Sequence, residues 1–204
     1  MYKRQVLNAK LEEGRVYGTA YINKQQFDAL DLPERWQRFI VIRDLRDAFV
    51  SGYWSWKLSH PSGSLALDPA REQLRAMSLN EGLLWLMDTW GGEATIVSSW
   101  MECPDEVIRY EDLLDDDVGI LVPLLTERLE LDIDPGYAAT IIEGARFDAW
   151  TKGRQRGTED VTDHNRKGVA GDWKNYIVGP VADKFKELYG QTLIDSGYET
   201  GFDW

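Results

Sequence analysis

Two segments of the chain place basic side chains where they could bind an anion. In the first, Arg43 ends an apolar run, and Ser51 follows eight residues later within a helical pattern. The free N–H groups and the dipole at the start of such a helix favour an anion. A guanidinium can also bind a phosphate through two parallel hydrogen bonds. The alternative is that Arg43 pairs with Asp47 and that Ser51 is a small packing residue.

The second segment, RKGVAGDWKNY, begins with the adjacent cations Arg166 and Lys167, which Gly168 follows. Glycine lets backbone N–H groups approach an oxyanion closely. Because the chain as a whole has a net charge of -12, cations gathered on a glycine-containing loop indicate a local anion site. The alternative is a solvated surface turn in which Asp172 pairs with Lys174.

Two aromatic residues could supply a platform for a nucleotide base. Tyr110, in IRYEDL, is expected at the end of a strand, and Phe147 lies in ARFDAW. An aromatic ring can stack on a base, and a tyrosine hydroxyl can also donate a hydrogen bond. Taken alone, each residue is equally compatible with a place in the core.

The composition limits the class of protein. The chain has 204 residues, of which 43% are hydrophobic and 28% are charged, as in an ordinary globular domain. No apolar run reaches the roughly 18 to 20 residues that a membrane span needs, and the acidic net charge argues against broad nucleic-acid binding. Cys103 is the chain's one cysteine, so we expect no internal disulfide and a reducing, cytoplasmic location. No metal-ligand spacing is present, so no metal is expected.

The elements that must position these residues alternate between strands and helices. Residues 38–43, RFIVIR, predict a buried parallel strand, and a helix is expected from Asp44 to just before Pro61. Residues 14–22, GRVYGTAYI, predict another strand, and a third is expected to end near Tyr110. This alternation predicts an α/β fold with a parallel sheet, in which ligands bind at the carboxyl ends of the strands. Helix start signals occur at four further positions: Asp68, Ser78, Asp134 and Pro180.

In this order, the four segments resemble the PAPS-dependent sulfotransferases of the cytosolic and bacterial type. These enzymes transfer a sulfuryl group from 3′-phosphoadenosine 5′-phosphosulfate (PAPS) to a hydroxyl or amine. The resemblance implies a P-loop-NTPase-like parallel sheet flanked by helices, forming a single sulfotransferase-like domain over residues 1–204. It also implies a small-molecule acceptor, whose identity the sequence does not tell.

The resemblance assigns roles to the basic segments. Arg43 and Ser51 are similar to the strand-end arginine and the helix serine that bind the 3′-phosphate of PAPS. Arg166, Lys167 and Gly168 are similar to the Arg-Lys-Gly loop that closes on the same phosphate.

The resemblance also covers the aromatic residues. Tyr110 is similar to the tyrosine of the family's Tyr-Glu-Asp segment, which contacts adenine, and Phe147 is similar to an aromatic residue that packs on adenine. Leu45 stands where proline is common in the family.

The chain departs from the family pattern before residue 43, where no glycine-rich phosphate loop is found. We therefore expect an N-terminally truncated domain that lacks the family's first strand and its phosphosulfate-binding loop. The alternative function is an inactive or partial fragment that binds the 3′-phosphate and adenine without transfer. A P-loop kinase is a further alternative, although nothing in the sequence resembles a Walker A loop.

The catalytic base and the oligomeric state are less defined. The family's usual histidine is absent from the stretch before Arg43, so His60 is the candidate base, whereas His164 is expected to shape the basic loop. Residues 174–183 lack the Thr-Val pair of the family's dimerisation segment, and the oligomeric state stays open.

Overall fold

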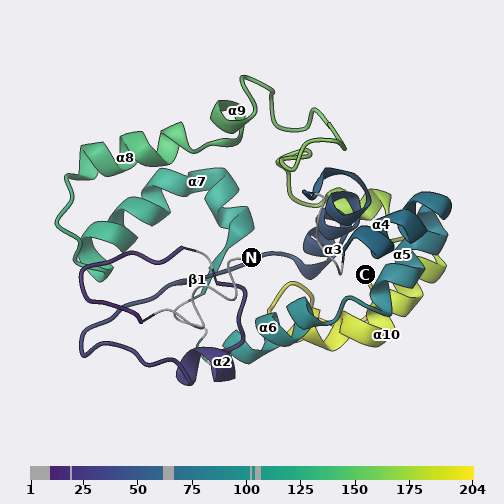
Figure 1. Ribbon diagram of the computed structural model, residues 1–204, viewed down its shortest axis with the longest axis horizontal. Helices are drawn as coiled ribbons and strands as arrows, with labels where there is room; N and C mark the ends of the chain where they lie inside the picture. The colour runs from purple at the N-terminus through teal and green to yellow at the C-terminus, as the bar shows by residue number, and fades with distance from the viewer. Residues whose placement is uncertain (1–9, 19, 62–66, 102, 104–106) are drawn as a thin grey trace.

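The computed structural model describes residues 10–18, 20–61, 67–101, 103 and 107–204 (Figure 1). Within these residues, the sheet consists of two parallel strands, β1 (Ile40–Ile42) and β2 (Val107–Arg109). Ile40 pairs with Val107, and Ile42 pairs with Arg109. The strands expected to end at Arg43 and near Tyr110 are confirmed, as is an α/β fold with a parallel sheet flanked by helices.

Helices make up most of the remaining structure. Figure 1 shows α7 and α8 side by side, and α3, α4, α5 and α10 gathered in a second group. No helix in the described ranges is long and apolar enough to cross a membrane. The helical elements are α2 (Lys24–Asp28), α3 (Leu45–Trp54), the π turn η1 (Ser55–Ser59), α4 (Leu67–Ala76), α5 (Leu79–Met87), α6 (Gly92–Trp100), α7 (Tyr110–Pro123), the π turn η3 (Leu124–Arg128), α8 (Pro135–Gly144), α9 (Phe147–Trp150), the 3-10 turn η4 (Asp172–Asn175) and α10 (Pro180–Asp195).

The helix starts follow mostly from local capping chemistry. Asp44 accepts the N–H of Arg46 and begins α3, and Ser78 begins α5 through a reciprocal capping box with Glu81. Asp134 caps α8 by accepting the N–H of Tyr137. These three expected starts, and that of α10 at Pro180, are confirmed. The start expected at Asp68 is displaced, because α4 already includes this residue as its second position.

The strand expected over residues 14–22 is wrong for the positions described there, 14–18 and 20–22, which are turn and irregular backbone. Val16 is 86% exposed while Ile22, on the same side of the alternating pattern, is 2% exposed, so that side is not buried along its length. A strand also needs a neighbour for its backbone N–H and C=O groups. The segment is instead attached at its end, where the carbonyl of Ile22 accepts the indole N–H of Trp100 at 2.9 Å.

The main hydrophobic core lies between α3, α5 and α10. Phe49 of α3 packs edge-on against Trp90 and Phe185, with ring centres 5.0 and 5.5 Å apart. Tyr53, one turn further along α3, is also fully buried. Helix α3 is therefore held along its length by a close-packed interior, and this fixes the side chains at its start, next to β1.

Candidate functional site

The carboxyl ends of the two strands bring Arg43 and Tyr110 together. Arg43 directly follows β1 and Tyr110 directly follows β2, and the parallel pairing places both at one edge of the sheet. The guanidinium carbon of Arg43 lies 4.8 Å from the centre of the Tyr110 ring. The Nε atom of Arg43 is buried and has no hydrogen-bond partner among the described residues. Since buried polar groups are nearly always paired, this donor is available for a ligand oxygen.

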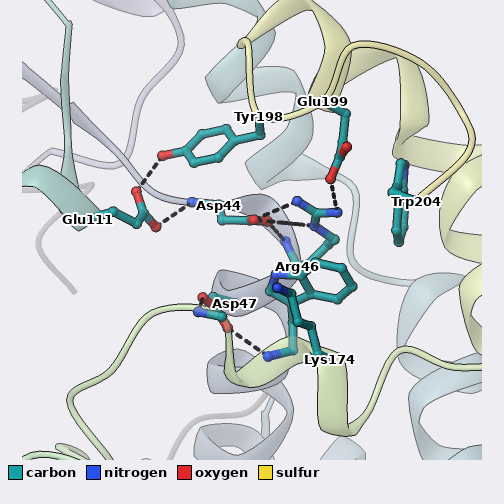
Figure 2. Close-up of a pocket in the computed structure, with 10 residues that line it drawn as sticks. Asp44, Arg46, Asp47, Glu111, Lys174, Tyr198, Glu199 and Trp204 are labelled. Atoms are coloured by element: carbon teal, nitrogen blue, oxygen red, sulfur yellow. Dashed lines mark hydrogen bonds and ion pairs between the residues drawn. The ribbon is translucent and has the colours of Figure 1, made fainter.

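Glu111 ties both strand ends to the C-terminal segment. Its Oε1 atom accepts the N–H of Asp44 at 3.0 Å, and its Oε2 atom accepts the hydroxyl of Tyr198 at 2.6 Å (Figure 2). Burial, and then the hydrogen bond to Glu111, raise the pKa of Tyr198 above its ordinary value, so its hydroxyl stays a donor. Asp44 follows Arg43, and Glu111 follows Tyr110. The Glu111 carboxylate therefore fixes the backbone next to both candidate binding residues.

A pocket of about 520 Å³ lies beside this junction (Figure 2). The guanidinium carbon of Arg46 lies 3.8 Å from the ring centre of Trp173 and 4.5 Å from that of Trp204. The same guanidinium pairs with Asp44 at 2.7 Å and with Glu199 at 2.5 Å. Arg46 thus fills the space between the two indole rings and the two carboxylates, so its charge is already neutralised within the protein.

Asp47 connects α3 to the C-terminal basic loop, which comprises residues 151–176 and includes η4. It is 2% exposed, and its carboxylate accepts the N–H of Gly171 at 2.6 Å and that of Trp173 at 2.9 Å. Burial raises the pKa of Asp47, while the two backbone hydrogen bonds act against this rise. The charge of Arg43 also acts to lower the pKa of Asp47, but among the described residues no ion pair joins the two side chains, so the pair weighed as the alternative is not formed. Ser51 lies four residues later on the same face of α3.

The cations at the end of the basic loop are paired inside it. Asp172, 5% exposed, accepts from Arg166 at 2.5 Å and from Lys167 at 2.7 Å. Burial acts to raise the pKa of Asp172, but the hydrogen bonds from Lys167 and Arg166 outweigh it and hold the pKa below its ordinary value. Arg166 also pairs with Glu159. The alternative of a turn in which Asp172 pairs with Lys174 is therefore wrong.

Gly168 brings the basic loop into contact with Phe147. Its φ is +67°, and a Cβ atom added there would lie 2.5 Å from the Phe147 ring. Arg154 reinforces the contact, because its guanidinium carbon lies 5.0 Å from the centre of the same ring and Nη1 donates to the carbonyl of Arg166 at 2.6 Å. Phe147 and the cationic end of the loop consequently form one surface.

The candidate base His60 lies beside His164, with ring centres 6.4 Å apart. His60 follows η1, and its carbonyl accepts a hydrogen bond from Arg71 at 2.5 Å. Burial, then the neighbouring charges of His164 and Arg71, lower the pKa of His60. The imidazole is therefore neutral near neutral pH and able to accept a proton.

The structure arranges the expected site residues in two linked groups. Arg43 and Tyr110 form the first, at the strand ends, and Phe147 with the end of the basic loop forms the second. Asp47 joins them through α3. Three residues that contact Arg166 are not among the expected site residues: Arg154, Glu159 and Tyr176. The sequence signal near them is the group of cations in residues 152–175, where six Lys or Arg residues stand against four acidic residues.

We predict that Asp47→Ala lowers the free energy of unfolding by about 1–3 kcal/mol, because two backbone N–H groups lose their acceptor. The amides of Gly171 and Trp173 should also exchange with solvent hydrogen faster. Thermal unfolding and hydrogen exchange measure the two effects. Asp47→Asn keeps one acceptor oxygen, so its free energy of unfolding is expected to lie between those of Asp47→Ala and the parent. Unchanged exchange at both amides in Asp47→Ala would show that the carboxylate does not hold the loop.

A second prediction separates backbone strain from steric contact at Gly168. Gly168→Ala should destabilise the protein by about 2–4 kcal/mol, because alanine disfavours positive φ and its Cβ would displace Phe147. Gly171→Ala is the matched control, since Gly171 has a φ of +77° and open space around its Cβ position. The free energy of unfolding of this control should fall by only about 1–2 kcal/mol. Equal losses in thermal unfolding would show that the Phe147 contact does not matter.

Comparisons with known proteins identify the family of the chain. Residues 37–197 match the sulfotransferase domain family. The chain is 24% identical over 179 residues to human Sulfotransferase 2A1, covering 80% of this chain and 58% of the relative. It is 25% identical over 170 residues to Cytosolic sulfotransferase 11 of Arabidopsis thaliana, covering 77% of this chain and 47% of the relative.

A solved structure, mouse sulfotransferase SULT7A1 complexed with PAP, is similar with 21% identity and a TM-score of 0.48, covering 75% of this chain and 57% of that one. The chain thus spans little more than half the length of the human relative. The family match extends over most of the chain and includes both strands and the basic loop. The chain belongs to the sulfotransferase domain family.

Proposed function

We propose that this protein transfers a sulfuryl group from PAPS to a hydroxyl or amine of a small molecule. The observation that carries the proposal is the buried Nε of Arg43, which lies at the carboxyl end of β1 beside the ring of Tyr110 and has no hydrogen-bond partner among the described residues. A phosphate oxygen would satisfy this donor, and a nucleotide base could use the aromatic surface next to it. Membership of the sulfotransferase family supports PAPS as the nucleotide.

In this proposal the 3′-phosphate of PAPS lies between α3 and the basic loop. Arg43 and Ser51 approach it from the strand end and the helix, while Arg166 and Lys167 approach it from the loop. The backbone of Gly168, free of a side chain, allows the loop to come close. The support is that Asp47 attaches the loop to α3 at 2.6 and 2.9 Å.

Adenine recognition is assigned to Tyr110 and Phe147. Tyr110 belongs to the strand-end group and Phe147 to the loop group, so adenine would contact both. Rings of this kind bind a base through stacking, which is worth about 1–3 kcal/mol for each base. No metal is required for these contacts, and we propose none.

The transfer step asks mainly for positioning and charge stabilisation. The sulfuryl group moves in line from the nucleotide phosphate to the acceptor oxygen or nitrogen, as in phosphoryl transfer. Cations stabilise the departing phosphate, and a base takes the acceptor's proton. His60 is the proposed base, since its lowered pKa leaves the ring neutral. Contacts to the remote 3′-phosphate contribute binding energy that orients the donor.

The phosphate contacts predict a selective loss of affinity. Arg43→Ala should weaken binding of adenosine 3′,5′-bisphosphate by about 10- to 100-fold, because it removes a charge-assisted hydrogen bond. Arg166→Ala should weaken it by a smaller factor, about 10-fold or less, because Arg166 is already paired with Glu159 in the ligand-free protein. Isothermal titration calorimetry measures this, with thermal unfolding to verify that the variants are folded. Adenosine 5′-monophosphate, which lacks the 3′-phosphate, should lose little affinity in Arg43→Ala.

Arg35→Ala serves as the arginine control, because Arg35 is exposed and pairs with Glu13. Unchanged bisphosphate affinity in both site variants would contradict the phosphate assignment. Binding of ATP as tightly as the bisphosphate would favour a kinase. Bisphosphate binding without transfer from PAPS to any of a panel of phenols and amines would favour a nucleotide-binding protein without transferase activity.

The assignment of His60 predicts a loss of rate with no loss of nucleotide affinity. His60→Gln should lower sulfuryl transfer from PAPS by about 10²- to 10⁴-fold, the usual contribution of a general base. Its affinity for adenosine 3′,5′-bisphosphate should stay unchanged. His164→Gln, which alters the neighbouring ring, is expected to retain most of the transfer rate. Transfer by His60→Gln at the parent rate would remove His60 from the mechanism.

A further inference from the structure

The two carboxylates that bind Arg166 differ in burial. Asp172 is 5% exposed and also accepts from Lys167 at 2.7 Å and from Asn175 at 3.0 Å. The side chain of Glu159 is 35% exposed, and its partners are Arg166 and the hydroxyl of Tyr176. Asp172 is therefore a fixed part of the loop, whereas Glu159 covers Arg166 from the solvent side.

Two donors converge on a single oxygen of Glu159. The Oε1 atom accepts from Nη1 of Arg166 and, at 3.2 Å, from the hydroxyl of Tyr176. The same Nη1 atom lies 3.2 Å from the Tyr176 oxygen. Burial raises the pKa of Tyr176 above its ordinary value, so its hydroxyl remains a donor at neutral pH. An anionic oxygen held by a guanidinium and a phenol has the surroundings that a phosphate oxygen requires.

The position of Glu159 therefore conflicts with a ligand on the solvent side of Arg166. A phosphate approaching there would meet a carboxylate of the same charge, and the donor it needs is already used. Moving Glu159 into water leaves no buried charge unpaired, because its side chain is already partly solvated. Asp172 would keep Arg166 and Lys167 oriented during the exchange.

We propose that Glu159 holds the place of one phosphate oxygen in the ligand-free loop, and that the 3′-phosphate displaces it to bind Arg166 and Tyr176. This inference rests on the proposed function, because it concerns the same phosphate. It adds Tyr176 to the residues that contact the ligand, and it makes Glu159 an internal competitor that lowers the affinity for the nucleotide.

The test measures the affinity of adenosine 3′,5′-bisphosphate by calorimetry in variants of the full chain. Glu159→Gln and Glu159→Ala should bind about three- to five-fold more tightly, the factor expected for loss of a partly exposed ion pair. Tyr176→Phe should bind about three- to ten-fold more weakly, because one hydrogen bond to the phosphate is lost. Adenosine 5′-monophosphate should show neither change.

Asp160→Asn is the matched control for the loss of one negative charge. Asp160 is the next residue, it accepts from the N–H and hydroxyl of Thr162 at 2.9 and 2.6 Å, and an amide oxygen can keep both bonds. Its affinity should change by less than about two-fold, since exposed charges that are not in contact with the ligand are screened by salt.

Three results would overturn the inference. Equal or weaker binding by both Glu159 variants would show that the carboxylate does not compete. An equal gain in affinity in Asp160→Asn would show that the effect comes from the net charge of the protein and not from Glu159. A parent protein that does not bind the bisphosphate would overturn the proposed function and this inference together, whereas a parent that binds it while the Glu159 variants gain nothing would overturn the inference alone.

Discussion

Asp47 accepts two backbone N–H groups from Gly171 and Trp173, and the geometry of the candidate site depends on these hydrogen bonds. Helix α3, which carries Asp47, is fixed by the core around Phe49 and Phe185. The carboxylate therefore holds the glycine-containing loop, which has few buried apolar residues, against a helix that the core keeps in place. Burying the charge is unfavourable, and the two charge-assisted bonds offset part of this cost and hold the loop against α3.

The cations of the site fall into two classes under this constraint. Arg166 and Lys167 have carboxylate partners within the loop, so they hold its shape even without a ligand. Arg43 has a ring beside it and a buried Nε without a partner in the described residues. An anion could therefore accept a hydrogen bond from Arg43 Nε, whereas the guanidinium of Arg166 is already paired with carboxylates. A clamp built from both classes combines a preformed loop with one open donor at the strand end.

How much of this could be read from the sequence depends on the range of the interactions. The caps at Ser78 and Asp134 depend on near neighbours, and they are correctly predicted. The strand before Arg43 is also correctly predicted, although it pairs with the distant β2, because a short continuous apolar run is typical of a strand in a parallel sheet. The strand expected over residues 14–22 is wrong because a strand depends on a partner that local alternation does not reveal. The Asp172–Lys174 pair, which is the alternative to an anion site, is not formed, because the loop turns back at Gly168 and Gly171, where φ is positive, and Asp172 pairs with Arg166. The place of Tyr176 depends on the same fold-back and has no local signal.

The two arginines should consequently contribute unequally to nucleotide affinity under the proposed function. A phosphate that reaches Arg43 would accept from Nε, which has no partner among the described residues, so no existing hydrogen bond of Nε has to be given up. A phosphate that reaches Arg166 replaces Glu159, and only the difference between the two anions is gained. Arg166 would then contribute more to selectivity for a nucleotide with a 3′-phosphate than to the affinity itself. A ligand without the 3′-phosphate cannot displace Glu159, and the loop would keep its own internal ion pair.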